Sequence, residues 1–332
     1  MQSALTPTLV VTYQNKNITA DISQFLLDAT YTDVLEGESD SLEISLSDTE
    51  GRWLNAWYPT HGDSISLKIG YQNAPLLACG DFEIDEISLD GAPDVVKIKA
   101  LAAGVTRAVR THKGKAYEHT NLRDIAATVA KHNKLKLLGT IEPIAITRVT
   151  QVFETDLTFL KRLAAEYGYS FSVRGANLTF FKRAALKAEA TILSLARTDL
   201  ATYSFRDKVH GVVAAASVNY HDPHKKLTRI VVAQDGKTTS NKTSADTLKL
   251  NIKAENDVQA KHKATAALDR ANEEQTVANF SLMGNVKLVA GINVAVTSFG
   301  KMDGKYQVIK STHTFSRSNG YSTDIELKRV RA

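Results

Sequence analysis

The sequence predicts a mainly β protein with an α+β insert, and two observations lead to this fold class. Apolar and polar residues alternate with period two through the first hundred residues and again from Tyr203 onward, which is typical of half-buried antiparallel strands. Between these regions, residues 151–181 hold a helix with both of its end signals and then a short hairpin. This order predicts three domains, which we place at residues 1–105, 106–185 and 186–332.

The first domain is expected to be an antiparallel sandwich or barrel, because its short strands follow one another closely. A turn at residues 14–17 separates the first two strands. The acidic loop at residues 35–40 is expected to protect a sheet edge from pairing with another chain. The expected strands are residues 9–13, 18–22, 42–46, 65–71, 82–89 and 96–100.

The middle domain begins with a basic segment, residues 107–119, which is poor in apolar residues and is expected to be a loop or linker. A helix is then expected from Thr120 or Asn121 to just before Lys134. Residues 141–151 are expected to be extended. The apolar stripe of the helix consists of Leu122, Ile125, Ala126, Val129 and Ala130.

The segment that follows carries the clearest local signals in the chain. Thr155 occupies the N-cap position of a helix, and Asp156 favours the positive end of the helix dipole. Gly168 supplies the stop at the C-terminal end. A hairpin is then predicted from residues 170–173 and 177–181, with the turn between them. The apolar residues that recur on one face of the helix are Phe159, Leu160, Leu163, Ala164 and Tyr167.

The third domain is expected to start with a connector of weak helical character and then to return to strands. A helix is expected near residues 257–273, where Asn256 and Gln259 have capping-box spacing. No residue-level repeat relates this domain to the first one, so the sequence does not demonstrate a duplication. The expected strands are residues 212–220, 227–233, 248–252, 294–299, 306–310, 313–315 and 323–327.

Charge is divided unevenly along the chain. The net charge is +5, yet residues 1–100 hold 5 Lys and Arg against 16 Asp and Glu, whereas the remainder holds 36 against 20. This asymmetry favours either a charged partner or head-to-tail contacts between copies in an assembly. The alternative is that acidic and basic solvent-exposed faces are segregated without such a role.

Residues that could support catalysis or metal binding occur in unfavourable settings. Cys79 lies in an apolar run and is expected to be buried, and a single cysteine excludes an intrachain disulfide. The turn that holds His221 and His224 offers no third metal ligand. Neither the nucleophile motif G-x-S-x-G nor a glycine-rich phosphate-binding motif is present. We therefore predict no catalytic, cofactor-binding or metal-ligating residues and no enzyme activity.

The remaining polar residues of interest are expected to be structural. Asp81, Glu83 and Asp85 are expected to lie on the solvated face of a strand, and His313 is expected to be packed or hydrogen-bonded. No membrane span is expected, because no window approaches 18 apolar residues, and the start of the chain shows no secretory signal. The protein is therefore expected to fold in a reducing cytosol.

Nucleic-acid binding through the basic middle region is the main alternative function, because two basic clusters could contact phosphates. The aromatic residues fall at core positions of strands and form no stacking platform between the basic residues, so specific recognition is not expected. A cell-wall-degrading tail enzyme is a third alternative, which the lack of a carboxylate pair in an apolar setting opposes. The basic clusters are Arg107, Arg110, Lys113 and Lys115, and Lys131, His132, Lys134 and Lys136.

Residues 151–181 resemble the central module of the late control protein D family of contractile-tailed phages. The family pattern is a Gln, an acidic or polar residue, a Phe-Leu pair, a Leu-Ala pair, an aromatic-Gly pair and a pair of strands that ends in aromatics. The helix at residues 120–133 is also similar to the family, as is a closing hairpin with His313, Gly320, Tyr321 and Thr323. The residues that match the central pattern are Gln151, Glu154, Phe159, Leu160, Leu163, Ala164, Tyr167, Gly168, Phe180 and Phe181.

This resemblance implies a non-enzymatic baseplate hub with two tube-like antiparallel β-barrel domains plus a small α+β module. Three copies are then expected to form a ring with pseudo-six-fold symmetry, which joins the six-fold tail tube to the three-fold central spike. The implied partners are further copies of this chain, the spike protein, the tail tube protein, and tape measure and baseplate wedge proteins.

The resemblance also implies where the protein acts. It is expected to be assembled in the bacterial cytoplasm into the baseplate of a phage tail or of an R-type bacteriocin. The family is similar to the first part of type VI secretion spike proteins. A lysozyme-like domain and a spike β-helix are expected on separate chains, because neither pattern occurs here.

Overall fold

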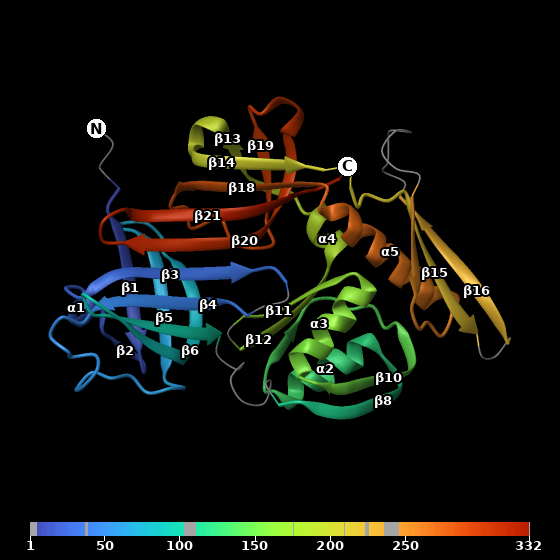
Figure 1. The fold of residues 1–332 in the computed structure, drawn as a ribbon, viewed down its shortest axis with the longest axis horizontal. Helices are drawn as coiled ribbons and strands as arrows, with labels where there is room; N and C mark the ends of the chain where they lie inside the picture. The colour runs from blue at the N-terminus through green and yellow to red at the C-terminus, as the bar shows by residue number, and fades with distance from the viewer. Residues whose placement is uncertain are drawn as a thin grey trace.

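A 13-stranded sheet forms the larger part of the protein (Figure 1). The computed structural model describes residues 5–36, 39–102, 111–174, 176–208, 210–222, 226–235 and 246–331. Two halves of the large sheet enclose separate apolar cores, and two smaller α/β units have cores of their own. The fold is therefore mainly β with α+β additions, which confirms the predicted class.

The first half of the sheet lies in the N-terminal hundred residues, where alternate side chains point into one core. The expected strand at residues 18–22 is wrong, because the Asn17 side chain accepts a hydrogen bond from the Thr19 amide and the chain turns into a short helix. The elements are β1 (Pro7–Tyr13), β2 (Lys16–Asn17), α1 (Thr19–Ile22), β3 (Leu26–Val34), β4 (Ser41–Ser47), β5 (Ser64–Tyr71), β6 (Leu77–Asp90) and β7 (Val95–Ala102).

The second half of the sheet comes from the last part of the chain, and its core centres on Phe280, Tyr306 and Leu288. The predicted hairpin that closes the chain is present as β20 and β21. The elements are β13 (Thr191–Ala196), η1 (Arg197–Asp199), β14 (Leu200–Asp207), β18 (Thr276–Met283), β19 (Asn293–Thr297), η2 (Gly300–Met302), β20 (Gly304–Ser316) and β21 (Gly320–Arg329).

Strand β20 joins the two halves into one sheet. Its first part pairs with β19, and its second part pairs with β3, from Lys310 opposite Val34 to Ser316 opposite Asp28. Figure 1 shows β14, β18, β21, β20, β3 and β4 side by side across this junction. Strand β3, which makes the junction, was not predicted from the sequence.

The middle module follows the predicted pattern closely. Thr155 caps its second helix by accepting a hydrogen bond from the Thr158 amide, and Gly168 ends it with φ of 78°. The predicted hairpin is present, whereas Gly175 in its turn lies outside the described residues. The elements are β8 (Lys113–Asn121), α2 (Leu122–His132), β9 (Lys136–Leu138), β10 (Ala145–Glu154), α3 (Asp156–Tyr167), β11 (Tyr169–Arg174), β12 (Asn177–Lys182) and α4 (Arg183–Ala188).

The basic segment before α2 is not a linker where it is described. Residues 113–119 belong to β8, which pairs antiparallel with β10. This strand escaped prediction because its side chains are mostly exposed and therefore do not alternate between apolar and polar. Residues 103–110, which include Arg107 and Arg110, lie outside the described residues.

A fourth unit was not distinguished in the sequence from the strands of the second half. Strands β15 (Ala215–Asp222), β16 (Leu227–Gln234) and β17 (Thr247–Asn251) form their own sheet, and α5 (Asp257–Glu273) packs on it. The bounds of α5 match the predicted helix, and the Asn256 side chain accepts a hydrogen bond from the Gln259 amide. No helix among the described residues is long and apolar enough to cross a membrane.

Candidate assembly interface

The two halves of the large sheet have the same order of hydrogen-bonded strands, which we call the strand plan. In the first half, β4 lies between β3 and β7, and β6 lies between β7 and β5. In the second half, β18 lies between β14 and β21, and β20 lies between β21 and β19. Each of these pairings is antiparallel. The corresponding strands are therefore β3 with β14, β4 with β18, β5 with β19, β6 with β20, and β7 with β21.

The irregularities of the strands also correspond. A bulge between Ile84 and Glu86 interrupts the pairing of β6 with β7, and a bulge between Val308 and Lys310 interrupts the pairing of β20 with β21. Strands β3 and β14 each carry a bulge after their first residue. Bulges are specific features of a backbone, so matched bulges fix the residue correspondence between the halves.

Two pairs of glycines support the same correspondence. Gly62 and Gly291 have φ of 87° and 98°, and their amides donate 2.8 Å hydrogen bonds to the carbonyls of Ile84 and Val308, respectively. The second pair with positive φ is Gly80 and Gly304. The halves are therefore a structural duplication, which the sequence could not demonstrate because most of the corresponding side chains differ.

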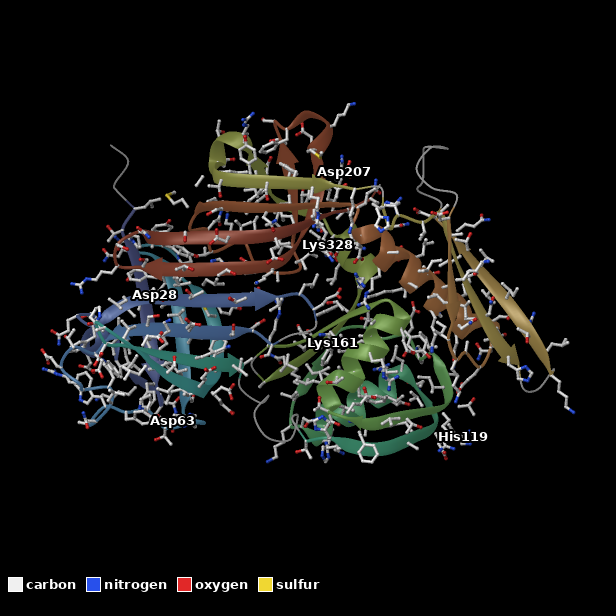
Figure 2. All side chains as sticks on the ribbon, viewed as in Figure 1. Asp28, Asp63, His119, Lys161, Asp207 and Lys328 are labelled. Carbon is white, nitrogen blue, oxygen red and sulfur yellow. The ribbon has the colours of Figure 1, made fainter. Side chains whose placement is uncertain are left out.

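One face of the eight adjacent strands from β14 to β6 is polar. The other face packs into the two cores. Oppositely charged residues lie together on the polar face, as in the 3.4 Å ion pair between Lys310 and Glu326. Figure 2 labels Asp28 on β3 and Lys328 on β21. Polar residues of this face include Asp28, Thr30, Glu43, Ser45, Glu86, Ser88, Lys97, Lys99, Ser204, Arg206, Asn279, Lys310, Thr312, Asp324 and Glu326.

This run of strands has two free edges. Among the described residues, β14 pairs only with β18, and β6 from Glu86 to Asp90 pairs only with β7. Both edges expose apolar side chains, since Tyr203 on β14 is 40% exposed and Leu89 on β6 is 46% exposed. Unpaired amides and carbonyls on an edge strand are a template for pairing with another chain. This surface therefore offers backbone groups that could pair with a strand of another chain.

The acidic loop after β3 lies on a sheet edge, as expected, because Ser39 forms a bridge with Val173 on β11, the edge strand of the three-stranded sheet; Gly37 and Glu38 lie outside the described residues. The loop also meets charged partners from its own chain. Glu36 Oε1 lies 3.0 Å from Arg183 Nε, and Arg183 also pairs with Glu273 on α5. Lys187 pairs with the same Glu273, and burial lowers the pKa of Lys187 to about 8. This cluster ties the first half, α4 and α5 together.

A second buried cluster lies beside that loop. Arg174 on β11 approaches Asp33 on β3, and Asp33 Oδ2 also accepts a 2.8 Å hydrogen bond from the Ala290 amide. Asp40 is buried nearby, where the Val34 amide and the Tyr31 hydroxyl approach its carboxylate. Burial raises the pKa of Asp33, and burial together with Asp33 raises the pKa of Asp40 to about 7.

Cys79 and His313 are buried, as predicted from their neighbours. Burial raises the pKa of the Cys79 thiol. His313 Nδ1 lies 2.7 Å from the Tyr321 hydroxyl, its Nε2 lies 2.8 Å from the Leu288 carbonyl, and burial lowers its pKa to about 4. Both residues are therefore structural parts of the sheet.

The residues considered for metal and acid–base chemistry remain apart. Asp81 is exposed, and Glu83 and Asp85 are partly exposed on the same strand, in agreement with a solvated face. His221 is exposed on β15, and His224 lies outside the described residues. In the described part of the chain, no three His, Cys, Asp or Glu residues are arranged to hold a metal ion.

The described basic residues of the middle module are only partly available to a ligand. Lys113 Nζ forms a 2.6 Å ion pair with Asp156, and Lys115 Nζ lies 4.6 Å from the centre of the Tyr117 ring. Tyr117 itself stacks on Phe159 in the core of the module. Lys131, His132, Lys134 and Lys136 are exposed around the end of α2.

The bulge of β10 forms a surface feature that was not predicted from the sequence. Phe153 has φ of 45° and is 80% exposed, and the adjacent Val152 is also exposed. Below it, the buried Gln151 side chain donates hydrogen bonds to the Glu154 carbonyl and to Asp156 Oδ1. A strained, exposed aromatic on a fixed support is typical of a contact residue.

Comparisons with known proteins agree with the resemblance. A family model described as phage tail baseplate hub (GPD) matches residues 100–319. A probable baseplate hub protein of Escherichia phage 186 is 27% identical over 98% of this chain and 94% of its own length.

Solved structures share the fold. A 43 kDa tail protein of prophage MuSo2 from Shewanella oneidensis has a TM-score of 0.73 at 14% identity, covering 98% of this chain and 99% of that chain. An E. coli protein described as a component of the type VI secretion system has a TM-score of 0.57 at 13% identity, covering 91% of this chain and 73% of that chain.

Proposed function

This chain belongs to the phage tail baseplate hub family, and on that premise we propose that three copies form a ring that joins the six-fold tail tube to the three-fold central spike. The duplication of the large sheet carries the proposal. Because each chain holds two halves with the same strand plan, three chains supply six similar units. A three-fold ring of such chains can therefore match a six-fold partner on one side and a three-fold partner on the other.

The role we propose is geometric and non-enzymatic. The partners would be further copies of this chain, the spike protein and the tail tube protein, with tape measure and baseplate wedge proteins as additional contacts. The polar face of the sheet, with its mixed charges, is suited to line a water-filled passage. Assembly would take place in the bacterial cytoplasm, and the finished ring would belong to the baseplate of a phage tail or of an R-type bacteriocin.

Native mass spectrometry tests the proposal on the full chain, alone and with the spike and tube proteins of the same tail. We expect a species of about 109 kDa, three times the 36.3 kDa chain, or a complex of three hub chains with three spike chains. A chain that stays monomeric with both partners would contradict the proposal. Steeply salt-dependent binding to DNA by that monomer would favour the nucleic-acid alternative.

A further inference from the structure

We propose that the core of the first half is a binding site for a small amphiphilic molecule, which places an aliphatic chain between the strands and an ammonium head group at the mouth. The site is a cavity of about 490 Å³ at the end of this half where α1 and the loop of residues 48–63 lie. Its volume is within the usual range of small-molecule sites. The inference concerns a single chain and does not depend on the proposed ring.

The inner wall of the cavity is apolar and belongs to the core of the first half. Ile44 on β4, Ile84 on β6 and Ile98 on β7 line it, and they are 1%, 2% and 5% exposed. Apolar side chains that face an open space lack contacts on that side, so a hydrocarbon occupant would gain dispersion contacts and bury its own apolar surface. A charged group would lose its hydration there. The inner part is therefore suited to an aliphatic chain.

The duplicated second half differs at the position of Ile44. The bulge of β3 lies beside Leu46, and the bulge of β14 lies beside Leu282. Ile44 and Phe280 each lie two residues earlier on the paired strand. They therefore occupy equivalent positions in the two halves.

Phe280 fills the centre of the second core with an aromatic ring. Its ring centre lies 5.3 Å from that of Phe205 and 6.0 Å from that of Phe299. Ile44 supplies no such ring, and the space beside it is part of the cavity. Unfilled space in a core costs stability, so a hollow core next to a filled duplicate indicates that the space has a use.

Aromatic rings surround the mouth of the cavity. Trp57 and Tyr58 are 39% and 48% exposed, and Tyr13 is partly exposed on β1. The faces of such rings attract ammonium groups. Trp57 already has one cation beside it, since the Arg52 guanidinium lies 5.7 Å from its ring centre, and Arg52 is neutralised by an ion pair with Glu50. The mouth is therefore suited to a cationic head group.

The carboxylates at this end favour the same sign of charge. Asp21 on α1 is exposed and lines the cavity. Asp63, which Figure 2 labels at this end of the first half, accepts a hydrogen bond from the Tyr13 hydroxyl, and this bond lowers the pKa of the Asp63 carboxyl. Lys16 also lines the cavity, so the two carboxylates exceed its charge by one. An anionic head group would be repelled by this excess and by the acidic first hundred residues.

Tryptophan fluorescence tests the site directly. The chain has two tryptophans, Trp53 and Trp57, and both line the cavity. Titration of the full chain with decyltrimethylammonium, below the concentration at which it forms micelles, should give a saturable change in emission. Decanol and decanoate carry a neutral and an anionic head group on a chain of similar length. The ammonium probe should bind about tenfold more tightly than decanoate, with decanol between them.

Two variants separate the chain site from the head-group site. Ile44→Phe introduces the ring that Phe280 supplies in the second half, and it should weaken binding of all three probes at least about tenfold. Glu43→Phe is the matched control, because it adds the same ring at the next, exposed position on the other face of β4, and it should change the affinities by less than about twofold. Asp21→Lys should weaken the ammonium probe about fivefold and leave decanol unchanged.

The outcomes decide each part of the inference. Emission that does not saturate with any probe, or equal affinities of the native chain and Ile44→Phe, would overturn the site. Decanoate that binds as tightly as the ammonium probe would overturn the cationic head group. Circular dichroism checks the fold of each variant, and Asp21→Lys on the protein surface keeps the test valid where Ile44→Phe does not fold. Failure of the chain to form trimers would contradict the proposed ring alone.

Discussion

Arg174 and Asp33 meet where three parts of the protein join, with 2.8 Å between Arg174 Nη2 and Asp33 Oδ1. Asp33 belongs to β3, Arg174 ends β11 of the middle module, and the Ala290 carbonyl that accepts from Arg174 precedes β19 in the second half. Asp33 Oδ1 accepts no well-aligned hydrogen bond from the described residues, so the contact between Arg174 and Asp33 is mainly electrostatic. This contact helps to set the middle module against the large sheet.

Replacement of Arg174 by Met should destabilise the protein by about 3 kcal/mol, because it leaves the buried carboxylate of Asp33 without a counter-ion. Urea unfolding followed by circular dichroism measures the change. Arg148→Met is the matched control. Both side chains of the ion pair between Arg148 and Glu118 are exposed, so this pair should contribute less than about 1 kcal/mol to the free energy of unfolding. Equal effects of the two variants would argue against this role of Asp33.

Asp40 should make the protein less stable as pH rises. Its pKa of about 7 in the folded state lies above the value of a free aspartate, so the folded state retains a proton that the unfolded state has lost. The stabilisation is complete below about pH 4 and declines toward pH 7, with a slope of at most about 1.4 kcal/mol per pH unit. The Asp40→Asn variant lacks this contribution to the pH dependence of stability.

The free energy of unfolding of both proteins at pH 5 and pH 8 checks the prediction. The native protein should lose stability relative to Asp40→Asn between these values. A constant difference would show that Asp40 titrates as it does in the unfolded chain.

His313 should have the opposite effect. Burial lowers its pKa to about 4, so the unfolded state binds a proton between pH 6.5 and pH 4 that the folded state does not bind. The contribution is complete above about pH 6.5 and is lost as pH falls through 4. Relative to His313→Gln, the native protein should therefore lose stability on acidification. Thermal unfolding of the pair across this range measures it, and parallel curves would refute the prediction.

Phe153→Gly should stabilise the isolated chain by about 1 kcal/mol, because a positive φ disfavours residues with a Cβ and the exposed ring contributes little burial. Phe181→Gly is the matched control. Phe181 is also exposed, but it lies in the regular ladder of β12, where glycine should destabilise. Thermal unfolding compares the two, and a loss of stability in both would show that Phe153 packs more than its exposure indicates.

Gly139→Ala should destabilise by about 3 kcal/mol or more, because φ is 119° and a Cβ would lie 2.0 Å from the Phe180 carbonyl oxygen. Gly114→Ala should change the stability by less than about 0.5 kcal/mol, because a Cβ there meets no atom within 4 Å. Urea midpoints of the two variants give the comparison. A tolerated Gly139→Ala would mean that the loop before β10 can shift.

Elements with local signals were predictable from the sequence. Helices α2, α3 and α5 were found because caps at Asn121, Thr155 and Asn256, together with apolar spacing, are encoded within a few residues. The same holds for the closing hairpin. Strands β3 and β8 were missed, because their partners β20 and β10 lie elsewhere in the chain and much of their surface is polar.

The candidate interface was predictable only in outline. The uneven charge indicated contacts between copies, but it did not identify β6 and β14. The acidic loop was assigned to an edge, but the sequence cannot show that this edge is β11, where Ser39 meets Val173, or that Glu36 meets Arg183. Such contacts join residues more than a hundred positions apart, and they exist only after the middle module has packed on the sheet.

By itself, the sequence determined the mainly β class, the helices with their caps, and the resemblance to a hub family. These features depend on the spacing of residues that are close together in the sequence, so they can be recognised without the structure. The tertiary structure alone decided that the two halves are duplicates, that β20 and β3 unite them, and which edges remain free. The physical reason is that corresponding positions in the two halves need the same backbone geometry but not the same side chain. Leu89 on β6 and His313 on β20 are equivalent positions, for example, and only the strand pairings show this.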